Sequence, residues 1–577
     1  MRGAAGLAGS PGPPQRRLSG PMLTGRTAIT VAVAAIVVAV SVVPMLRLAI
    51  LALAPAGVLD LSAFADRLLR ATTLRAAIHS LDTSFFGAVL ALCIGGPFAA
   101  ATSLTDLPGK RAIGFLVVLP LMIAPQVTAL AWAHLFAPSS PLLALLHLAP
   151  PPGTPNPMLG RGGIILLFGV QHAPIVFLTV RAGLASVPRD LVEAARVSGA
   201  APLRAFVDMV LPLVRPHVVA GFALAFVSGI GNFGIPALLG MPVDYLTMTT
   251  LIYQKIASFG PTALPDAAAL SAAIALVALA GSAAGALALP SPAPKVVGDQ
   301  RVEFALGWAR LPAGSLAAVV VALTVVMPAL ALVATSLVPA FGVPLRLDTV
   351  TFDNFVEILF RQATTGRAFV NSFLLSAGTA IVAATIAVPL GWVAERAPHR
   401  VGQGLRALVD LPYAVPGIVV SIACILLFLK PLPLVGSLYG TIWILAAAYL
   451  MRFLALAAKP VATAIAAIPH ELEDAAADIG AGPVRRLVSV VAPLAVASAA
   501  AGALLVFMSA FNELTVSALL WSSGHETVGV ILLNLEEAGL GTEAAAVAVV
   551  SLIVVIGLLA IVDRLGRRLP AGVLPWR

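Results

Sequence analysis

The chain has 577 residues, of which 60% are apolar and 11% are charged, with a mean hydropathy of +1.01. Soluble proteins carry roughly 25% charged residues, so this composition excludes an ordinary soluble enzyme and indicates a surface that mostly faces a lipid bilayer. The net charge of +9 comes without basic runs interleaved with aromatic residues, which argues against a nucleic-acid partner and favours the charge bias of membrane loops. Cys93 and Cys424 both lie in apolar stretches, and we expect both to be small core residues.

A basic tail rich in glycine and proline covers residues 1–26, and twelve apolar stretches follow it. Each is long enough to cross a bilayer, which takes about 20 helical residues. The expected spans of the first half are 27–46, 77–103, 112–137, 163–185, 216–240 and 267–289. Those of the second half are 313–337, 368–394, 405–430, 439–457, 494–521 and 542–563. Pro120 and Pro412 mark expected breaks in the third span of each half.

The positive charges predict how these spans are oriented. With the N-terminus in the cytoplasm, 25 of the 35 Lys and Arg residues, Arg452 among them, fall in inside segments, nine fall outside and Arg47 lies at a span edge. The positive-inside rule therefore predicts that both termini are cytoplasmic. The first apolar stretch is too long for a signal-peptide core and lacks an obvious cleavage site, so we expect it to be retained.

A 26-residue segment occurs twice, at 188–213 and 469–494, with twelve identical positions and a constant offset of 281 residues. Because each half has six spans, both copies emerge on the same side of the membrane. The predicted fold is therefore an all-α, polytopic membrane protein with twelve transmembrane helices in two parallel six-helix repeats. The predicted domains are the tail, a first unit at 27–289 with the repeated loop 186–215, a linker at 290–312, and a second unit at 313–577 with the loop 467–493.

Each copy of the repeat reads as two short helices joined by a turn. Acidic residues follow the proline that begins the first helix, at Asp190, Glu471 and Glu473, where they complement the positive helix end. Gly199 and Gly480 are expected to end this helix in the left-handed conformation. A second short helix is expected between two further prolines, Pro202 and Pro212 in the first copy and Pro483 and Pro493 in the second. One copy alone reads equally well as a solvated connecting loop, but two copies at equal spacing favour a docking element.

This pattern resembles the signature loop of the permeases of ATP-binding-cassette importers. The first copy carries Glu193, Ala194, Ala195, Gly199 and Pro212, and the second carries Asp474, in place of the usual Glu, with Ala475, Ala476, Gly480 and Pro493. The resemblance implies the fold of a type I importer permease, in which each loop holds a coupling helix that enters a groove on an ATPase subunit. It also implies the partners and the location: two copies of a cytoplasmic ATPase that bind ATP and Mg²⁺, an extracytoplasmic solute-binding protein, and the bacterial plasma (inner) membrane.

Two further segments resemble a narrower subgroup, the fused permeases of ferric iron importers. These are GNFGIPALLG at 231–240 and FNELTVSALLWSSGHETVGV at 511–530. The resemblance implies ferric iron as the cargo. Relatives in the same subgroup handle thiamine, 2-aminoethylphosphonate or polyamines, which remain alternatives.

The chain lacks the phosphate-binding pattern G-x-x-x-x-G-K-[ST], so we expect ATP hydrolysis in another chain, no cofactor here and no enzyme activity. The eight histidines show no metal-ligand spacing. An ion-coupled secondary transporter is the alternative of another class, and it leaves the repeated loop unexplained. A membrane-embedded enzyme is a third reading, for which no cluster of catalytic side chains is apparent.

Candidate substrate-pathway residues follow each repeated loop. They are Gly231, Asn232 and Gly234 in the first unit and Asn512 and Glu513 in the second. The glycines allow either close helix packing or unwinding at a gate. Glu513 either faces a cavity at membrane depth or lies near the outer interface, if its span ends early.

Overall fold

The computed structural model describes residues 20–55, 57–151, 153–258, 260–288, 304–431 and 436–566. Within these ranges the chain is helical, and its one isolated β-bridge pairs Thr105 with Phe304. The predicted all-α fold is therefore confirmed for the part that the structure describes. The predicted tail up to residue 19, the linker at 290–303 and the C-terminal residues 567–577 lie outside the described residues.

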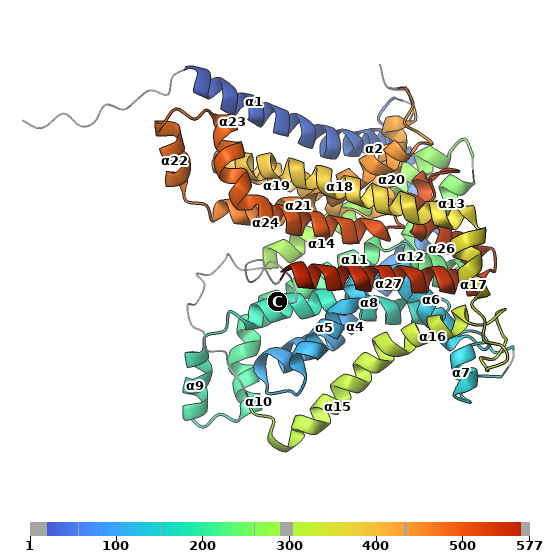
Figure 1. The fold of residues 1–577 in the computed structure, drawn as a ribbon. Helices are drawn as coiled ribbons and strands as arrows, with labels where there is room; N and C mark the ends of the chain where they lie inside the picture. The colour runs from blue at the N-terminus through green and yellow to red at the C-terminus, as the bar shows by residue number, and fades with distance from the viewer. Residues whose placement is uncertain are drawn as a thin grey trace, which may run out of the picture.

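The two units carry matching series of helices (Figure 1). The first unit contains α1 (Gly20–Val37), η1 (Val38–Val42), α2 (Val43–Leu53), α3 (Leu61–Leu69), α4 (Ala71–Leu104), α5 (Lys110–Met122), α6 (Pro125–Phe136), α7 (Pro141–Leu145), α8 (Arg161–Leu184), α9 (Arg189–Val197), α10 (Pro202–Ala205), η2 (Phe206–Val210), α11 (Leu211–Gly231), α12 (Gly234–Leu239), η3 (Met241–Val243), α13 (Met248–Ala257) and α14 (Ala263–Ala288). The second unit contains η4 (Gly307–Ala309), α15 (Arg310–Val321), η5 (Ala322–Val326), α16 (Met327–Ser336), α17 (Asp353–Val356), η6 (Glu357–Arg361), α18 (Ala363–Arg396), α19 (His399–Ala414), α20 (Gly417–Phe428), α21 (Ile442–Ala466), α22 (His470–Asp478), α23 (Pro483–Arg486), η7 (Leu487–Val491), α24 (Ala492–Phe511), α25 (Ser517–Leu520), α26 (Val528–Glu537) and α27 (Gly541–Gly566).

Eleven helices of the described chain are long and apolar enough to cross a membrane, and two bent pairs pass the same test together. One pair joins residues 234–243 to α13 at an angle of 74°, and the other joins α19 to α20 at 102°. Counting the α19–α20 pair as one span gives twelve spans, and counting both pairs gives thirteen. The predicted count of twelve lies within this range.

The third span of each unit is broken, but not at the predicted prolines. Pro120 and Pro412 lie inside α5 and α19. The chain instead becomes extended just before α6 and α20, where Ala124 has ψ 137° and Val415 has ψ 154°. Each of these residues precedes a proline, Pro125 or Pro416, whose ring disfavours the helical conformation of the residue before it. The break positions predicted from Pro120 and Pro412 were therefore wrong by a few residues.

The second short helix of each repeat does not end at Pro212 or Pro493, and this prediction was also wrong. The helix runs on into the bilayer span, so that Pro202–Gly231 and Pro483–Phe511 are each one candidate span. A π-helical turn, η2 or η7, ends two residues before each proline. A proline lacks the backbone N–H and clashes with the preceding turn of an α-helix, and the wider π turn accommodates both defects. The predicted span starts at 216 and 494 were consequently too late.

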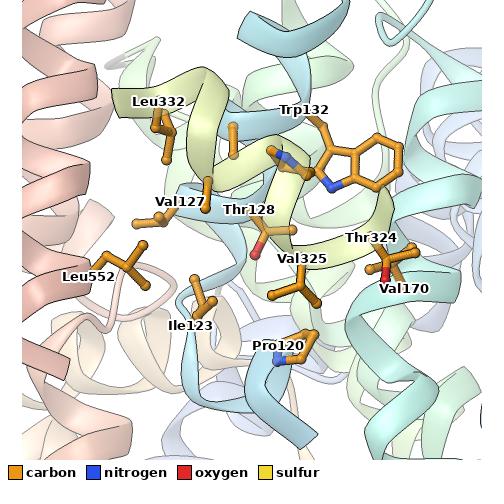
Figure 2. A pocket seen from close by; sticks show the side chains of 13 residues that line it. Pro120, Ile123, Val127, Thr128, Trp132, Val170, Thr324, Val325, Leu332 and Leu552 are labelled. Atoms are coloured by element: carbon orange, nitrogen blue, oxygen red, sulfur yellow. The ribbon is translucent and has the colours of Figure 1, made fainter. Parts of the chain in front are cut away.

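The first spans exchange partners between the units. Helix α2 packs on α14 of its own unit and on α20 of the other, while α16 packs on α27 and on α6. Figure 2 shows the pocket beside the contact of α6 with α16, where Val127, Trp132 and Leu332 lie together with Leu552 of α27. No charged side chain lines this pocket, so it is an apolar seam between the units.

Side chains on the outer faces of the helices are apolar as well. Helix α4, for example, exposes Ile78 and Phe85, which fits a surface in contact with lipid. Cys93 is also exposed on α4, whereas Cys424 is buried, so the prediction of a core position was wrong for Cys93. Its small apolar side chain suits either environment.

Candidate coupling and translocation sites

Helices α9 and α22, the predicted coupling helices, lie at the same end of the molecule, at the left in Figure 1. Gly199 and Gly480 follow them with φ of +87° each, which confirms the predicted left-handed ends. In both copies two backbone bonds close the turn: the glycine N–H donates to the carbonyl of Arg196 or Ala477, and the next N–H donates to Ala195 or Ala476 over 2.9–3.0 Å. This is the Schellman arrangement that ends a helix when glycine is available.

The two coupling helices present similar surfaces at matched positions. Glu193 and Ala194 are exposed on α9, and Asp474 and Ala475 are exposed on α22. Large apolar side chains are also exposed at positions 281 residues apart, namely Leu191 and Leu203 in the first copy and Leu472 and Val484 in the second. Exposed apolar groups rimmed by charge are typical of a protein-binding surface. Glu473 departs from the prediction, because its side chain is buried and not displayed at the helix start.

In the first unit, Asn232 occupies the break between α11 and α12. Its side-chain oxygen accepts a hydrogen bond from the N–H of Ile235 at 3.1 Å, and its backbone carbonyl accepts one from the hydroxyl of Thr249 at 3.0 Å. Asn232 is buried. It therefore caps α12 and ties the break to α13.

In the second unit, Glu513 stands 281 residues after Asn232 and caps α25 in the same way. One carboxylate oxygen accepts the N–H of Val516 at 2.8 Å, and the other accepts the hydroxyl of Thr515. The guanidinium of Arg452 lies 3.8 Å away. Glu513 is thus buried within the protein just beyond the end of α24 and holds the local fold of the break.

Arg452 and its counterpart Gln171 hold the other break of each unit. Gln171 donates to the carbonyls of Pro120 at 2.8 Å and Ile123 at 3.1 Å. Arg452, 281 residues later, donates to the carbonyl of Val415 at 3.2 Å. A side chain from α8 or α21 therefore satisfies carbonyls freed where the third span is broken. Arg452 lies well inside α21, so its assignment to an inside loop was wrong.

The breaks of the two units meet at the centre of the molecule. Gln126 of α6 is buried and donates to the backbone carbonyl of Asn512 at 2.7 Å. A Cβ atom at Gly234 would lie 3.2 Å from Gln126, and one at Gly231 would lie 3.6 Å from Pro416. The two glycines therefore serve close packing at positions where the helix also unwinds. The side-chain oxygen of Asn512 is buried without a hydrogen-bond partner in the described chain.

The structure thus brings all five predicted pathway residues to the helix breaks and adds three that the sequence analysis missed, Gln126, Gln171 and Arg452. The repeat offset relates Gln171 to Arg452, and this was the one available signal for them. Among the described residues, no group of three or more His, Cys, Asp or Glu side chains is placed to hold a metal ion.

A further ion pair lies outside the spans, where Glu526 precedes α26. Arg367 of α18 lies 3.1 Å from its carboxylate. Burial raises the pKa of Glu526, but the hydrogen bonds from Arg367 and from the N–H of Gly524 outweigh burial, so that the pKa is lowered overall. Glu526 is therefore ionised at neutral pH and fixes the loop that leads into α26.

Two related helical units whose broken helices face one another define a membrane transport protein. A family model described as the inner membrane component of binding-protein-dependent transport systems matches residues 99–289 and again residues 387–574. The chain belongs to this family and carries its unit twice, as the permease subunit of an ATP-binding-cassette importer.

Individual relatives support the same assignment. The chain is 26% identical over 508 residues to a probable ABC transporter permease, y4fN, of Sinorhizobium fredii, across 85% of this chain and 87% of the relative. It is 24% identical over 372 residues to the Fe(3+)-transport system permease FbpB 2 of Haemophilus influenzae, across 64% and 69%. It is 28% identical over 201 residues to a probable sulfate transport permease, cysT, of Anthoceros angustus, across 33% and 67%.

Proposed function

We propose that α9 and α22 each bind one copy of a cytoplasmic ATPase, and that the cargo crosses between the two units at their helix breaks. The observation that carries this proposal is the pair of matched surfaces at one end of the molecule. Both helices end in the same glycine turn and expose acidic and apolar side chains at equivalent positions. Two equal docking surfaces suit two equal partners.

The rest of the transport cycle belongs to other chains in this proposal. The ATPase binds ATP and Mg²⁺, and an extracytoplasmic binding protein delivers the cargo. Both termini are cytoplasmic, and the permease lies in the bacterial inner membrane. The excess of Lys and Arg on one set of segments and the family description support this orientation and location.

Ferric iron is the cargo that we propose. It is supported by the likeness to FbpB 2, which extends over 372 residues, and by the resemblance of the segments at 231–240 and 511–530 to fused iron permeases. The competing cargo is an anion such as sulfate, which the relative cysT is named for. The partly exposed guanidinium of Arg452 favours an anion, because an ionisable group inside a membrane protein marks a polar pathway.

The test is to reconstitute the permease in liposomes with its ATPase and its binding protein. ATP hydrolysis is expected to rise when the binding protein is loaded with ferric ion, and to stay basal with sulfate, thiamine, 2-aminoethylphosphonate or a polyamine. Stimulation by one of these instead would replace iron as the cargo. Uptake that follows an ion gradient without ATPase would overturn the importer mechanism in favour of a secondary transporter.

A further inference from the structure

The second coupling helix is held to the transmembrane body by a buried group of charged and polar side chains. The carboxylate of Glu473 on α22 accepts a hydrogen bond from the indole N–H of Trp392 at 2.8 Å and another from Nε of Arg396 at 2.8 Å. Both members of the ion pair are almost completely buried. A buried carboxylate is tolerated only when it is paired and hydrogen-bonded, and here each of its oxygens has a partner.

Arg396 also connects α22 to other elements. It donates to the carbonyl of Ile468 at 3.0 Å and contacts the ring of His470 at 3.1 Å. Its own carbonyl accepts a hydrogen bond from Arg26 of α1. The last residue of α18 therefore fixes the start of α22, the chain leading into it and the N-terminal helix.

The first coupling helix lacks this arrangement. Val192 occupies the position of Glu473, and Leu104 and Ala100 occupy those of Arg396 and Trp392 on the matching helix α4. Val192 and Leu104 are buried in one apolar cluster. Helix α9 therefore rests on apolar packing, which has no preferred direction, while α22 is held by charge-assisted hydrogen bonds, which do.

We propose that Trp392, Arg396 and Glu473 form a rigid joint that sets the angle between α22 and α18, so that the two coupling helices transmit motion unequally. A displacement of α22 passes directly to α18 through the joint. A displacement of α9 is partly absorbed by its apolar contact with α4. The three side chains are positioning residues, and their role in transport rests on the proposed function above.

Spin-label distances test the joint without any partner chain. Labels at Ile479 and Ile381, both exposed, report the position of α22 against α18 in the full-length protein with Cys93 replaced by serine. Labels at the equivalent positions Ser198 and Val89 form the matched pair in the first unit. We expect a narrower distance distribution for the second-unit pair than for the first-unit pair.

Two variants should remove this difference. Glu473→Gln keeps the side-chain shape and loses the charge, and Trp392→Phe keeps an aromatic ring and loses the donor. Each is expected to broaden the second-unit distribution to the width of the first, whereas Val192→Ala leaves it unchanged. Equal widths in the wild type, or no broadening in either variant, would overturn the joint.

A second readout tests the role of the joint in transport. In the reconstituted complex, both variants are expected to keep the ATPase bound while the cargo moved per ATP falls by about fivefold or more, the factor given by about 1 kcal/mol. An unchanged ratio overturns the transmission role. Failure of the wild type to bind an ATPase overturns the proposed function, but it leaves the distance result to decide the joint.

Discussion

The glycine turn at the end of α22 gives a direct way to disturb docking alone. Gly480 has φ of +87°, and a Cβ atom there would meet no other atom within 4 Å. Gly480→Val therefore causes no clash, and its whole effect comes from backbone strain. That strain costs about 1–3 kcal/mol, because a β-branched residue is a poor occupant of the left-handed region.

The strain is relieved by opening the turn, which breaks the hydrogen bonds from the N–H groups of Gly480 and Ala481 to the end of α22. A cost of 1–2 kcal/mol lowers the population of the ordered end by a factor of about 5–30. The bilayer spans are untouched, so the protein should insert and accumulate normally. We expect ATPase copurification with the permease to fall by a similar factor.

Two control variants isolate the cause. Gly482→Val introduces the same side chain two residues away, where φ is −67° and a Cβ atom also meets nothing within 4 Å, so it should behave like the wild type. Gly480→Asn should lose less than Gly480→Val, because asparagine tolerates the left-handed conformation. The reasoning is refuted if Gly480→Val binds the ATPase as well as Gly482→Val does.

Three further predictions concern the helix breaks and the loop before α26. Gln126→Leu leaves the carbonyl of Asn512 without its donor and should lower stability by about 1–3 kcal/mol, seen as a lower thermal midpoint in detergent; an unchanged midpoint contradicts this. Arg452→Leu should destabilise more than the double variant with Glu513→Gln, because the single change leaves an uncompensated carboxylate; additive losses in a double-mutant cycle would show that the pair is not coupled. Glu526→Gln should lower the midpoint at neutral pH, and the difference should vanish as the pH falls through the lowered pKa of Glu526, because protonation removes the same charge in the wild type; a difference that persists in acid would be inconsistent with the ion pair.

The repeated segment allowed the coupling helices to be predicted in detail, because helix caps and glycine turns depend on local sequence. Gly199 and Gly480 illustrate this, since their left-handed conformation follows from the residues around them. Proline was a weaker guide to helix ends. Pro212 and Pro493 lie within continuous helices because π turns precede them, and local sequence does not distinguish a π turn from a helix end.

Contacts between distant segments could not be predicted from one sequence. Gln126 and Asn512 are 386 residues apart, and Glu473 is 77 residues from Arg396. A buried Glu473 and an exposed acid at a helix start look alike in sequence, because both follow the same proline. Arg452 was assigned to a loop for a similar reason, since only the fold supplies the partner that makes a charge tolerable inside a helix.

Native mass spectrometry of the permease purified with its ATPase tests the central claim most directly. The account predicts two ATPase copies on each wild-type chain, one copy when either Glu193 or Asp474 is changed to lysine, and none when both are changed. A wild-type chain that moves its cargo without any ATPase bound, or a double variant that still holds two copies, would contradict it.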